Sequence, residues 1–377
     1  MIICRKEKQK LLLVTRKWRT ATLDTNPIGV YDLASYARNF NYLVDVHYID
    51  GLPVTNDYNL IGLSVFEGDN KTIFTDIEIL KQVYGNTKII IGGRWTKIID
   101  NEAKEWLHKN DIEIWYGDGE EFFSKEKQID FTTYPGWYKK DLITTNAKGR
   151  NIMSSRGCPF HCYFCHNPEN KISYFNTDYT VNNIQLLLEQ GANEIFFADD
   201  IFTLKKEHML NIYNELKKKY LNIDDRNLFF THVNLINEEI AEVMQKFKPT
   251  EVQVGLESGD NSMLKMMGKN FTINKAFDKI KLLSNYVKVN GLFLIGFPGE
   301  TKESLQNTFQ FVKEIKPFLY KKWVSLYQPI KNTNGYFRAL KEGTFHNELK
   351  NNAAVAYIPE GLTGEDLIKY RDLILNY

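Results

Sequence analysis

The sequence predicts an α/β protein in which a doubly wound, Rossmann-like domain is followed by a partial (β/α)6 barrel. Short apolar runs of strand length alternate with stretches of helical apolar spacing through most of the chain. One charged stretch with Pro135 and Gly136 interrupts this alternation. Successive parallel strands need a crossover helix, so the alternation implies two parallel sheets. We predict a Rossmann-like domain at 1–125, a linker at 126–149, a barrel at 150–330 and a short C-terminal extension at 331–377.

The amino-acid composition argues against several classes of protein. Four cysteines in 377 residues are too few for a disulfide framework. No window approaches the roughly 18 apolar residues of a membrane span. The formal net charge of +1 leaves no electrostatic footprint for nucleic acid or an anionic membrane. We therefore predict a cytoplasmic protein in a reducing compartment, with no nucleic-acid and no membrane partner.

The Rossmann-like domain is expected to contain five strands and three helices, in an order that alternates. Three of the apolar runs end at or beside glycine, as strands of a doubly wound sheet do. Ligands of such sheets bind at the carboxyl ends of the strands. The expected strands are 10–16, 42–49, 60–66, 88–93 and 112–117, and the expected helices are 28–40, 72–85 and 96–109.

The barrel is expected to contain six strands with helices between them, which is fewer than the eight of a closed barrel. Residues after 330 carry a few helical turns but too little apolar content for an independent core. The expected strands are 150–157, 193–199, 227–233, 251–257, 289–297 and 321–329.

Cys158, Cys162 and Cys165 lie within CPFHCYFC, and the rest of the chain holds only Cys4. The spacing C-x3-C-x2-C on a loop lets three soft thiolates converge on one metal centre. Zinc is one reading, with a histidine next to the second or third cysteine (His161 or His166) as the fourth ligand. An iron–sulfur cubane with one open iron is the other reading. We favour the cubane, because the motif follows the first barrel strand.

CPFHCYFC resembles the signature of the radical S-adenosylmethionine (SAM) superfamily. The resemblance implies a [4Fe–4S] cluster, held by Cys158, Cys162 and Cys165, whose unique iron is chelated by SAM. It also implies reductive cleavage of SAM to a 5′-deoxyadenosyl radical that abstracts hydrogen from substrate. Phe164 matches the family position near the SAM adenine. A flavodoxin or ferredoxin is the implied electron donor.

Two later segments extend the resemblance. FFADDIF ends the second barrel strand, where the family places polar groups for the SAM amino group, so Asp199 and Asp200 are candidates. Capping of the following helix is the alternative reading of these carboxylates. THVNLI resembles a segment in which an arginine often faces the SAM carboxylate, but His232 stands at that position. Histidine is not a permanent cation, and a buried structural role is the alternative for His232.

Two further segments follow in the family's order. EVQVGLESG matches the G-x-E-S-G turn after the fourth strand, where Glu257 and Ser258 would reach the SAM ribose or carboxylate. GLFLIGFPGET matches the fifth-strand motif, where Gly296 and Pro298 would let the backbone approach the adenine. No side chain is assigned a catalytic role.

The front domain resembles the cobalamin-binding domains that precede some radical SAM barrels. By this resemblance, Ser64 with Gly92 and Gly93 would leave a slot for the cobalamin nucleotide tail, and Gly117 would lie in the loop after the last strand. The D-x-H-x-x-G motif that ligates cobalt in free-standing domains is missing. The alternative is a domain that keeps the fold without the cofactor, and bulky residues such as Trp95 near the slot favour it.

The resemblance implies cobalamin-dependent radical methylation of an unactivated carbon in a small-molecule or peptide substrate. The alternative is a cobalamin-independent rearrangement, cyclisation or epimerisation with a vestigial front domain. Nothing in the sequence resembles the three-cysteine N-terminal domain of tRNA methylthiotransferases. Tyr327, Gln328 and Tyr336 are expected near the barrel mouth, as substrate contacts or as rim packing.

Overall fold

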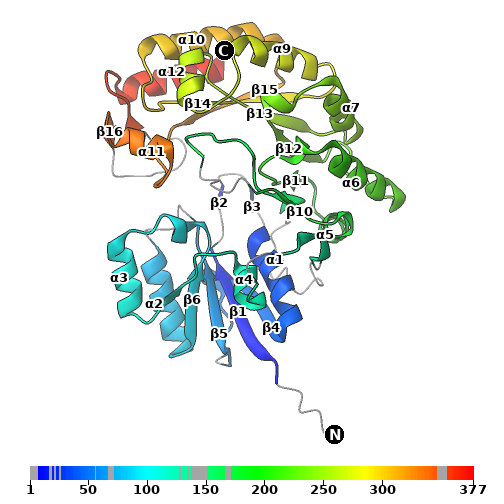
Figure 1. The fold of residues 1–377 in the computed structure, drawn as a ribbon, viewed down its shortest axis with the longest axis vertical. Helices are drawn as coiled ribbons and strands as arrows, with labels where there is room; N and C mark the ends of the chain where they lie inside the picture. Colours follow the sequence, from blue (N-terminus) through cyan, green and yellow to red (C-terminus); the bar gives the residue numbers. More distant parts are fainter. Residues whose placement is uncertain are drawn as a thin grey trace. The chain divides into compact units, whose positions relative to one another are not determined.

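The structure is a computed structural model whose described residues form two compact units (Figure 1). The first unit comprises the chain up to Asn151 together with Asp178–Asn193, and the second comprises Ile152–Thr177 and Glu194–Tyr377. The structure describes residues 7–16, 19–20, 23–24, 27–55, 57–66, 72–126, 129–134, 136, 151–165, 171–345 and 355–377.

The first unit is built on a five-stranded parallel sheet in the order β4-β1-β5-β6-β7. Its central strands are continuous apolar runs because helices cover both faces of the sheet. The sheet and these helices confirm the predicted doubly wound fold. The strands are β1 (Gln9–Thr15), β4 (Tyr42–Tyr48), β5 (Leu60–Ser64), β6 (Lys88–Gly92) and β7 (Glu113–Ile114), and the helices are α1 (Ile28–Ala37), α2 (Ile73–Tyr84), α3 (Asn101–Lys109) and α4 (Gly119–Ser124). A short hairpin, β2 (Arg19–Thr20) with β3 (Leu23–Asp24), follows β1.

Helix α5 (Thr177–Glu189) belongs to the first unit almost entirely, although its sequence position lies between two barrel strands. The Tyr179 hydroxyl donates to the fully buried Asp32 carboxyl of α1. The Tyr179 ring also meets Tyr134 edge-on at 5.6 Å, and Tyr134 donates to Glu120 at 2.6 Å. Buried carboxyls need such donors. The tyrosines therefore fasten α5 to α1 and α4.

The second unit is built on a six-stranded open sheet in the order β15-β14-β13-β12-β11-β8. Neighbouring strands from β11 to β15 pair in parallel, and Ala198 after β11 donates its N–H to Ile152 of β8 at 2.8 Å. The predicted partial barrel is confirmed. The strands are β8 (Asn151–Ile152), β11 (Ile195–Phe197), β12 (Asn227–Thr231), β13 (Glu251–Glu257), β14 (Val289–Ile295) and β15 (Lys321–Leu326).

Helices cover the outer side of this sheet as an arch (Figure 1). Six helices begin directly after an Asn, Asp or Thr whose side chain accepts a backbone N–H of the first turn, which is the usual start signal. Among the described residues, no helix is long and apolar enough to cross a membrane. The helices are α6 (Lys206–Lys218), α7 (Glu238–Lys246), α8 (Asn261–Met266), α9 (Ile273–Leu283), α10 (Lys302–Ile315), α11 (Asn334–Ala339) and α12 (Gly364–Asn376).

The C-terminal extension contributes to the barrel core instead of forming a core of its own. Tyr357 and Ala339 pack with Met263, Phe297 and Tyr327 in one buried cluster. Helix α12 lies against β15 and α10. Two short antiparallel hairpins complete the unit, β9 (Ser155–Arg156) with β10 (Ser173–Tyr174) and β16 (Thr344–Phe345) with β17 (Tyr357–Ile358).

The anchoring of α5 can be tested with Tyr179→Phe. We expect this change to lower the free energy of unfolding by about 1–3 kcal/mol, because the buried Asp32 carboxyl loses a donor. Urea denaturation followed by far-UV circular dichroism measures the loss. The control is Tyr220→Phe at a residue that is 95% exposed, for which no loss is expected. Equal stability of Tyr179→Phe and the parent protein would contradict this account of α5.

Candidate functional site

The cysteine loop begins directly after β9, at a glycine that no other residue can replace without strain. Gly157 has φ +94°, and a Cβ there would lie 2.1 Å from the Lys171 carbonyl oxygen. The Gly157 N–H donates to the Asp200 carboxylate at 3.1 Å. The loop therefore starts in a conformation held by the segment just before β10 and by Asp200, which follows β11.

The middle of the loop is fixed by two segments that are far away in the sequence. The Tyr163 N–H donates to Met267 O at 2.9 Å, at the end of α8, and Tyr163 O accepts from the Gly335 N–H at 2.7 Å, in α11. Gly268 has φ +74°, and a Cβ there would lie 2.6 Å from the His161 carbonyl oxygen. Backbone-to-backbone approach on both sides holds the loop in one place.

The three thiols lie within electrostatic range of one another. Cys158 and Cys162 are half-buried, and Cys165 is exposed. Burial, together with the charges of Asp200, Cys162 and Cys165, raises the pKa of Cys158 to about 11, although a backbone N–H at Phe160 opposes the rise. Burial also raises the pKa of Cys162. Ionising several of these thiols together therefore requires a compensating cation, and a metal centre supplies one.

A zinc site and an iron–sulfur cluster require different sets of ligand side chains. Among the described residues, no three His, Cys, Asp or Glu side chains are placed to hold a single metal ion. His166, one of the fourth ligands considered for zinc, lies outside the described residues, as does Cys4.

Lys269 is a buried cation beside the cysteine loop, and the sequence reasoning missed it. Its ammonium lies 3.1 Å from the Glu257 carboxylate, and it lies 5.8 Å from the centre of the Phe164 ring. Burial alone would lower the pKa of Lys269, but Glu257 and Cys162 outweigh that effect and raise it. The lysine therefore stays charged. Nothing in the local sequence distinguishes Lys269 from the many solvated lysines of the chain.

Glu257 is held in an unusual backbone conformation at the carboxyl end of β13. Its φ is +62°, in the left-handed region that glycine normally occupies, and the register with β14 shifts between Gly255 and Glu257. A Cβ on Gly255 would lie 2.5 Å from the Glu257 carboxylate, so the glycine makes room for it. Strain of this kind persists where the surrounding structure requires it, and it concentrates at functional sites.

The two adjacent aspartates after β11 point toward the start of the cysteine loop. Asp199 is 1% exposed and accepts from the Ser154 N–H at 3.1 Å, the Ser154 hydroxyl at 2.8 Å and the Ser155 hydroxyl. Burial, partly opposed by these hydrogen bonds, raises the pKa of Asp199 to about 6. Helix α6 begins after Lys205 without a side-chain cap, so neither aspartate caps it.

His208 extends this buried network from α6. Its Nε2 lies 3.0 Å from the Ser154 hydroxyl, and its ring packs against Tyr174 at 4.7 Å. Burial, with a smaller effect of the nearby Lys205, lowers the pKa of His208 to about 4. The ring is therefore neutral near pH 7 and supports the strand that leads into the cysteine loop.

His232 lies directly against the cysteine motif. Its ring stacks on Phe160 at 3.7 Å with 14° between the planes, and its Nδ1 accepts from the Asn234 N–H at 3.2 Å. Burial, with the charges of Lys269 and Lys275, lowers the pKa of His232 to about 3. A neutral ring cannot supply the cation that an arginine at this position would supply, whereas Lys269 is a buried cation near the ring.

The other residues predicted to contact SAM, Ser258, Gly296 and Pro298, lie in turns of the barrel, and Ser258 and Gly296 form hydrogen bonds with neighbouring barrel residues. The Ser258 hydroxyl is buried, lies 3.1 Å from the Thr308 hydroxyl and accepts from the Asp260 N–H at 3.1 Å. Gly296 has φ +83°, and its N–H donates to Glu300, a carboxyl whose pKa burial raises to about 7. Pro298 is buried in the same turn.

Phe164, predicted near the SAM adenine, and the three residues predicted near the barrel mouth differ in their exposure. Phe164 packs partly buried against the cluster that contains Phe297 and Tyr327. Tyr327 is 2% exposed, so rim packing describes it better than substrate contact. Gln328 and Tyr336 are half-buried.

In the front domain, the predicted cobalamin residues lie at the carboxyl ends of neighbouring strands. Ser64 pairs with Gly92, and a Cβ on Gly92 would meet no atom within 4 Å. Gly93, with φ +99°, packs against the Val65 backbone, where a Cβ would lie 2.5 Å from the carbonyl oxygen. Trp95 is 4% exposed within the core and does not fill this space.

Gly117 lies in the loop after β7 at an exposed position. A Cβ there would approach the Glu121 carboxylate and would lie 3.3 Å from Trp115 Nε1. Ser64, Gly92, Gly93 and Gly117 therefore all lie at the carboxyl edge of the sheet, which is the edge where doubly wound folds bind ligands.

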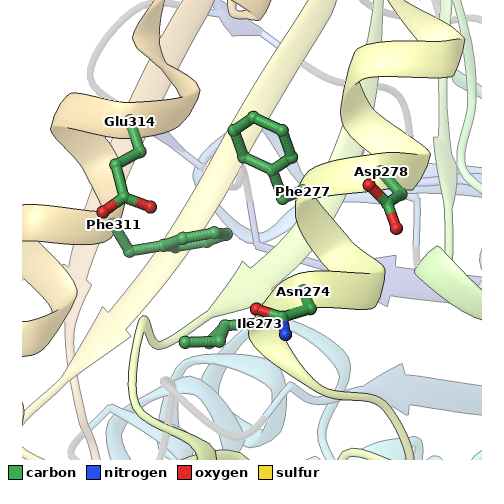
Figure 2. Close-up of a pocket in the computed structure, with 6 residues that line it drawn as sticks. All are labelled: Ile273, Asn274, Phe277, Asp278, Phe311 and Glu314. Carbon is green, nitrogen blue, oxygen red and sulfur yellow. The ribbon is translucent and has the colours of Figure 1, made fainter.

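A separate pocket of about 380 Å³ lies between α9 and α10 in the outer helix layer. Figure 2 shows the Phe277 and Phe311 rings facing it from the two helices, with Glu314 beside Phe311. Ile273, Asn274 and Asp278 complete its lining. The pocket shares no residue with the loop and turns described above.

These observations define a partial β/α barrel that carries a three-cysteine loop at the carboxyl edge of its sheet. Residues 152–312 match the model of the Radical SAM superfamily. The chain therefore carries a radical SAM domain, and the predicted resemblance is confirmed for it. The cofactors of such a domain are a [4Fe–4S] cluster and SAM. The three neighbouring thiols and the buried Lys269 fit these two groups.

Two curated relatives are similar to this chain over part of their length. The chain is 32% identical over 187 residues to an uncharacterized methyltransferase of Pyrococcus horikoshii, which is 47% of this chain and 39% of that protein. It is 27% identical over 296 residues to a putative methylthiotransferase of Methanocaldococcus jannaschii, which is 70% of this chain and 66% of that protein. The chain thus spans less than half the length of the first of these relatives.

Two solved structures cover both units. The radical SAM methyltransferase TsrM from Kitasatospora setae, solved with cobalamin and a [4Fe–4S] cluster, matches 97% of this chain and 85% of its own, with a TM-score of 0.71 and 14% identity. The cobalamin-dependent SAM radical enzyme OxsB matches 88% of this chain and 55% of its own, with a TM-score of 0.69 and 16% identity. At these identities the likeness shows a shared fold.

The backbone requirement at the loop can be tested with Gly157→Ala. Gly191→Ala is the matched control, because Gly191 also has a positive φ (+85°) but has no neighbouring atom within 4 Å of the added Cβ. We expect Gly157→Ala to lose most of the iron that the parent protein binds after anaerobic reconstitution, and Gly191→Ala to retain it. Iron per chain is the measurement. Full iron in Gly157→Ala would show that the loop tolerates the displaced Lys171 carbonyl.

The pH dependence of the free energy of unfolding tests whether His208 is buried in its neutral form. Its pKa is about 6.5 when unfolded and about 4 when folded, so folding excludes a proton, and stability falls as pH drops below about 6.5. For this residue the loss between about pH 8 and pH 5 is on the order of 2 kcal/mol.

His208→Gln should remove that loss and keep a hydrogen bond to Ser154. Urea midpoints of both proteins at the two pH values measure the difference. The Asp199 carboxyl titrates with the opposite sign in both proteins, so it cancels in the comparison. Equal acid losses in the two proteins would contradict the buried neutral state.

Proposed function

We propose that this chain is a cobalamin-dependent radical SAM methylase that transfers a methyl group to an unactivated carbon. The observation that supports the proposal most directly is the combination of two folds in one chain. A doubly wound sheet whose carboxyl edge has open space at Gly92 precedes a radical SAM domain. TsrM and OxsB share this fold, and both were solved with cobalamin bound.

Different residues of the barrel would bind the cluster and SAM. Cys158, Cys162 and Cys165 would ligate three irons of the cluster, and Lys269 would hold the SAM carboxylate as a permanent buried cation. Glu257 lies beside this ammonium and keeps it charged and oriented. When bound, the cluster with SAM supplies a carbon radical, and cobalamin supplies a methyl group.

Aromatic rings would keep water away from this chemistry. Phe160 is stacked on the buried, neutral His232, and Phe164 lies beside Lys269. Both rings belong to the cysteine loop and would lower the local dielectric, which strengthens the interaction of Lys269 with an anionic group. Asp199, Asp200 and Ser258 would act through the backbone turns that they hold.

One observation favours the alternative, a cobalamin-independent rearrangement, cyclisation or epimerisation. Gly93 is explained by its packing on Val65, without any cofactor.

Some relatives are tRNA methylthiotransferases. This chain has one cysteine outside the radical SAM motif, so it cannot supply three cysteines for a second cluster.

The test is the metal content of protein reconstituted anaerobically with iron, sulfide and hydroxocobalamin and then desalted. We expect about four irons and one cobalt per chain, the stoichiometry of one cubane with one cobalamin. Four irons without cobalt would support the alternative function. Zinc in place of iron would overturn the radical reading.

Gly92→Leu locates the cobalt within the front domain. Gly92 does not have a positive φ, so leucine fits its backbone and would fill the open space. We expect the variant to keep its iron and to lose cobalt retention at least about tenfold, which corresponds to roughly 1.4 kcal/mol. The control is Gly51→Leu, in the same unit, where a Cβ also meets no atom within 4 Å. Unchanged cobalt in Gly92→Leu would place the cofactor elsewhere.

A further inference from the structure

Three large apolar side chains are exposed next to the cysteine loop. Tyr163 of the loop is 41% exposed, and Phe337 and Leu340 are 50% and 57% exposed. Phe337 and Leu340 stand three residues apart at the α11 end, so they lie on one face. The hydrogen bond from Gly335 N–H to Tyr163 O joins α11 to the loop. We call Tyr163, Phe337 and Leu340 the α11 patch.

Exposed basic residues lie on or just after the two helices beside this patch. A Cβ on Gly299 would lie 3.0 Å from both Arg338 Nη2 and Met266 Sδ, so α8 and α11 are neighbours. Lys265 on α8 and Lys341 after α11 are both exposed. Arg338 pairs with Glu342 at 3.2 Å, and Glu342 is the one acidic residue within 261–266 and 334–342. The surface beside the cysteine loop is therefore apolar at its centre and basic at its rim.

A cluster held by the cysteine loop needs an external one-electron donor, and electron transfer requires that donor to come close to the loop. Complexes of redox partners are small and short-lived, and complementary charge mainly accelerates their encounter. An apolar centre with a basic rim fits a partner whose surface is acidic. Exposed apolar patches on soluble proteins also mark interaction sites.

We propose that an acidic one-electron donor protein docks on the α11 patch, with Lys265 and Lys341 steering its approach. This inference rests on the proposed function, because the donor is required only if the three cysteines hold a redox cluster. The donor's prosthetic group would then approach the cluster past Tyr163, which belongs to the cysteine loop itself.

The experiment measures how fast reduced flavodoxin, an acidic flavoprotein, bleaches the reconstituted cluster in a stopped-flow instrument without substrate. We expect Lys265→Glu/Lys341→Glu to slow the second-order rate about tenfold at low ionic strength. The difference should shrink as salt screens the charges. Reduction by dithionite, a small reductant that needs no docking surface, should be unchanged. The control is Lys218→Glu on α6, whose side chain is 77% exposed.

The outcomes separate the two proposals. An unchanged flavodoxin rate in the double variant, with its cluster present, would overturn the docking surface and leave the proposed function intact. Protein that binds no cluster in any form would overturn both. Phe337→Ala tests the apolar centre independently, and we expect it to slow flavodoxin at all salt concentrations, since apolar contact is not screened. A Phe337→Ala rate equal to the parent's at every salt concentration would remove the apolar part of the surface.

Discussion

Three thiols within eight residues can face one centre only while the backbone between them keeps a single conformation. That conformation is imposed from outside the motif. Lys171 and Asp200 hold the start of the loop at Gly157, and the ends of α8 and α11 hold its middle at Tyr163. Asp200 makes its contact through its carboxylate, and the others are close approaches of two backbones, which glycine permits at Gly157, Gly268 and Gly335. The cysteine site therefore exists only once the barrel and its C-terminal extension have assembled.

The charged groups near the cysteines are also held by buried contacts. Lys269 and Glu257 form an ion pair in which both side chains are almost fully buried. Such pairs contribute little to stability, because desolvation offsets their attraction. Glu257 also adopts a left-handed backbone conformation. A pair that is strained and gives little stability is best explained by a need for a fixed cation beside the cysteines, while His232 remains neutral.

The fold of the first unit does not by itself determine whether that unit binds cobalamin. Its sheet order, its apolar core and the close packing of Gly93 follow from the doubly wound architecture alone. Gly92 is different, because the structure gives no packing reason for the missing side chain. The case for cobalamin in this chain therefore depends on a small open space at one strand end, together with the shared fold of TsrM and OxsB.

Periodicity and local motifs were enough to predict both parallel sheets and the strands along the chain, and they marked the three-cysteine loop as the candidate site. These features depend on residues near one another in the sequence, which is why they could be predicted. Lys269 and the attachment of α5 to the first unit could not be predicted. Lys269 acquires its role from the distant Glu257 and Cys162, and α5 from Asp32, 147 residues before Tyr179. Only tertiary structure decides such contacts, because burial and electrostatic pairing depend on which distant side chains meet.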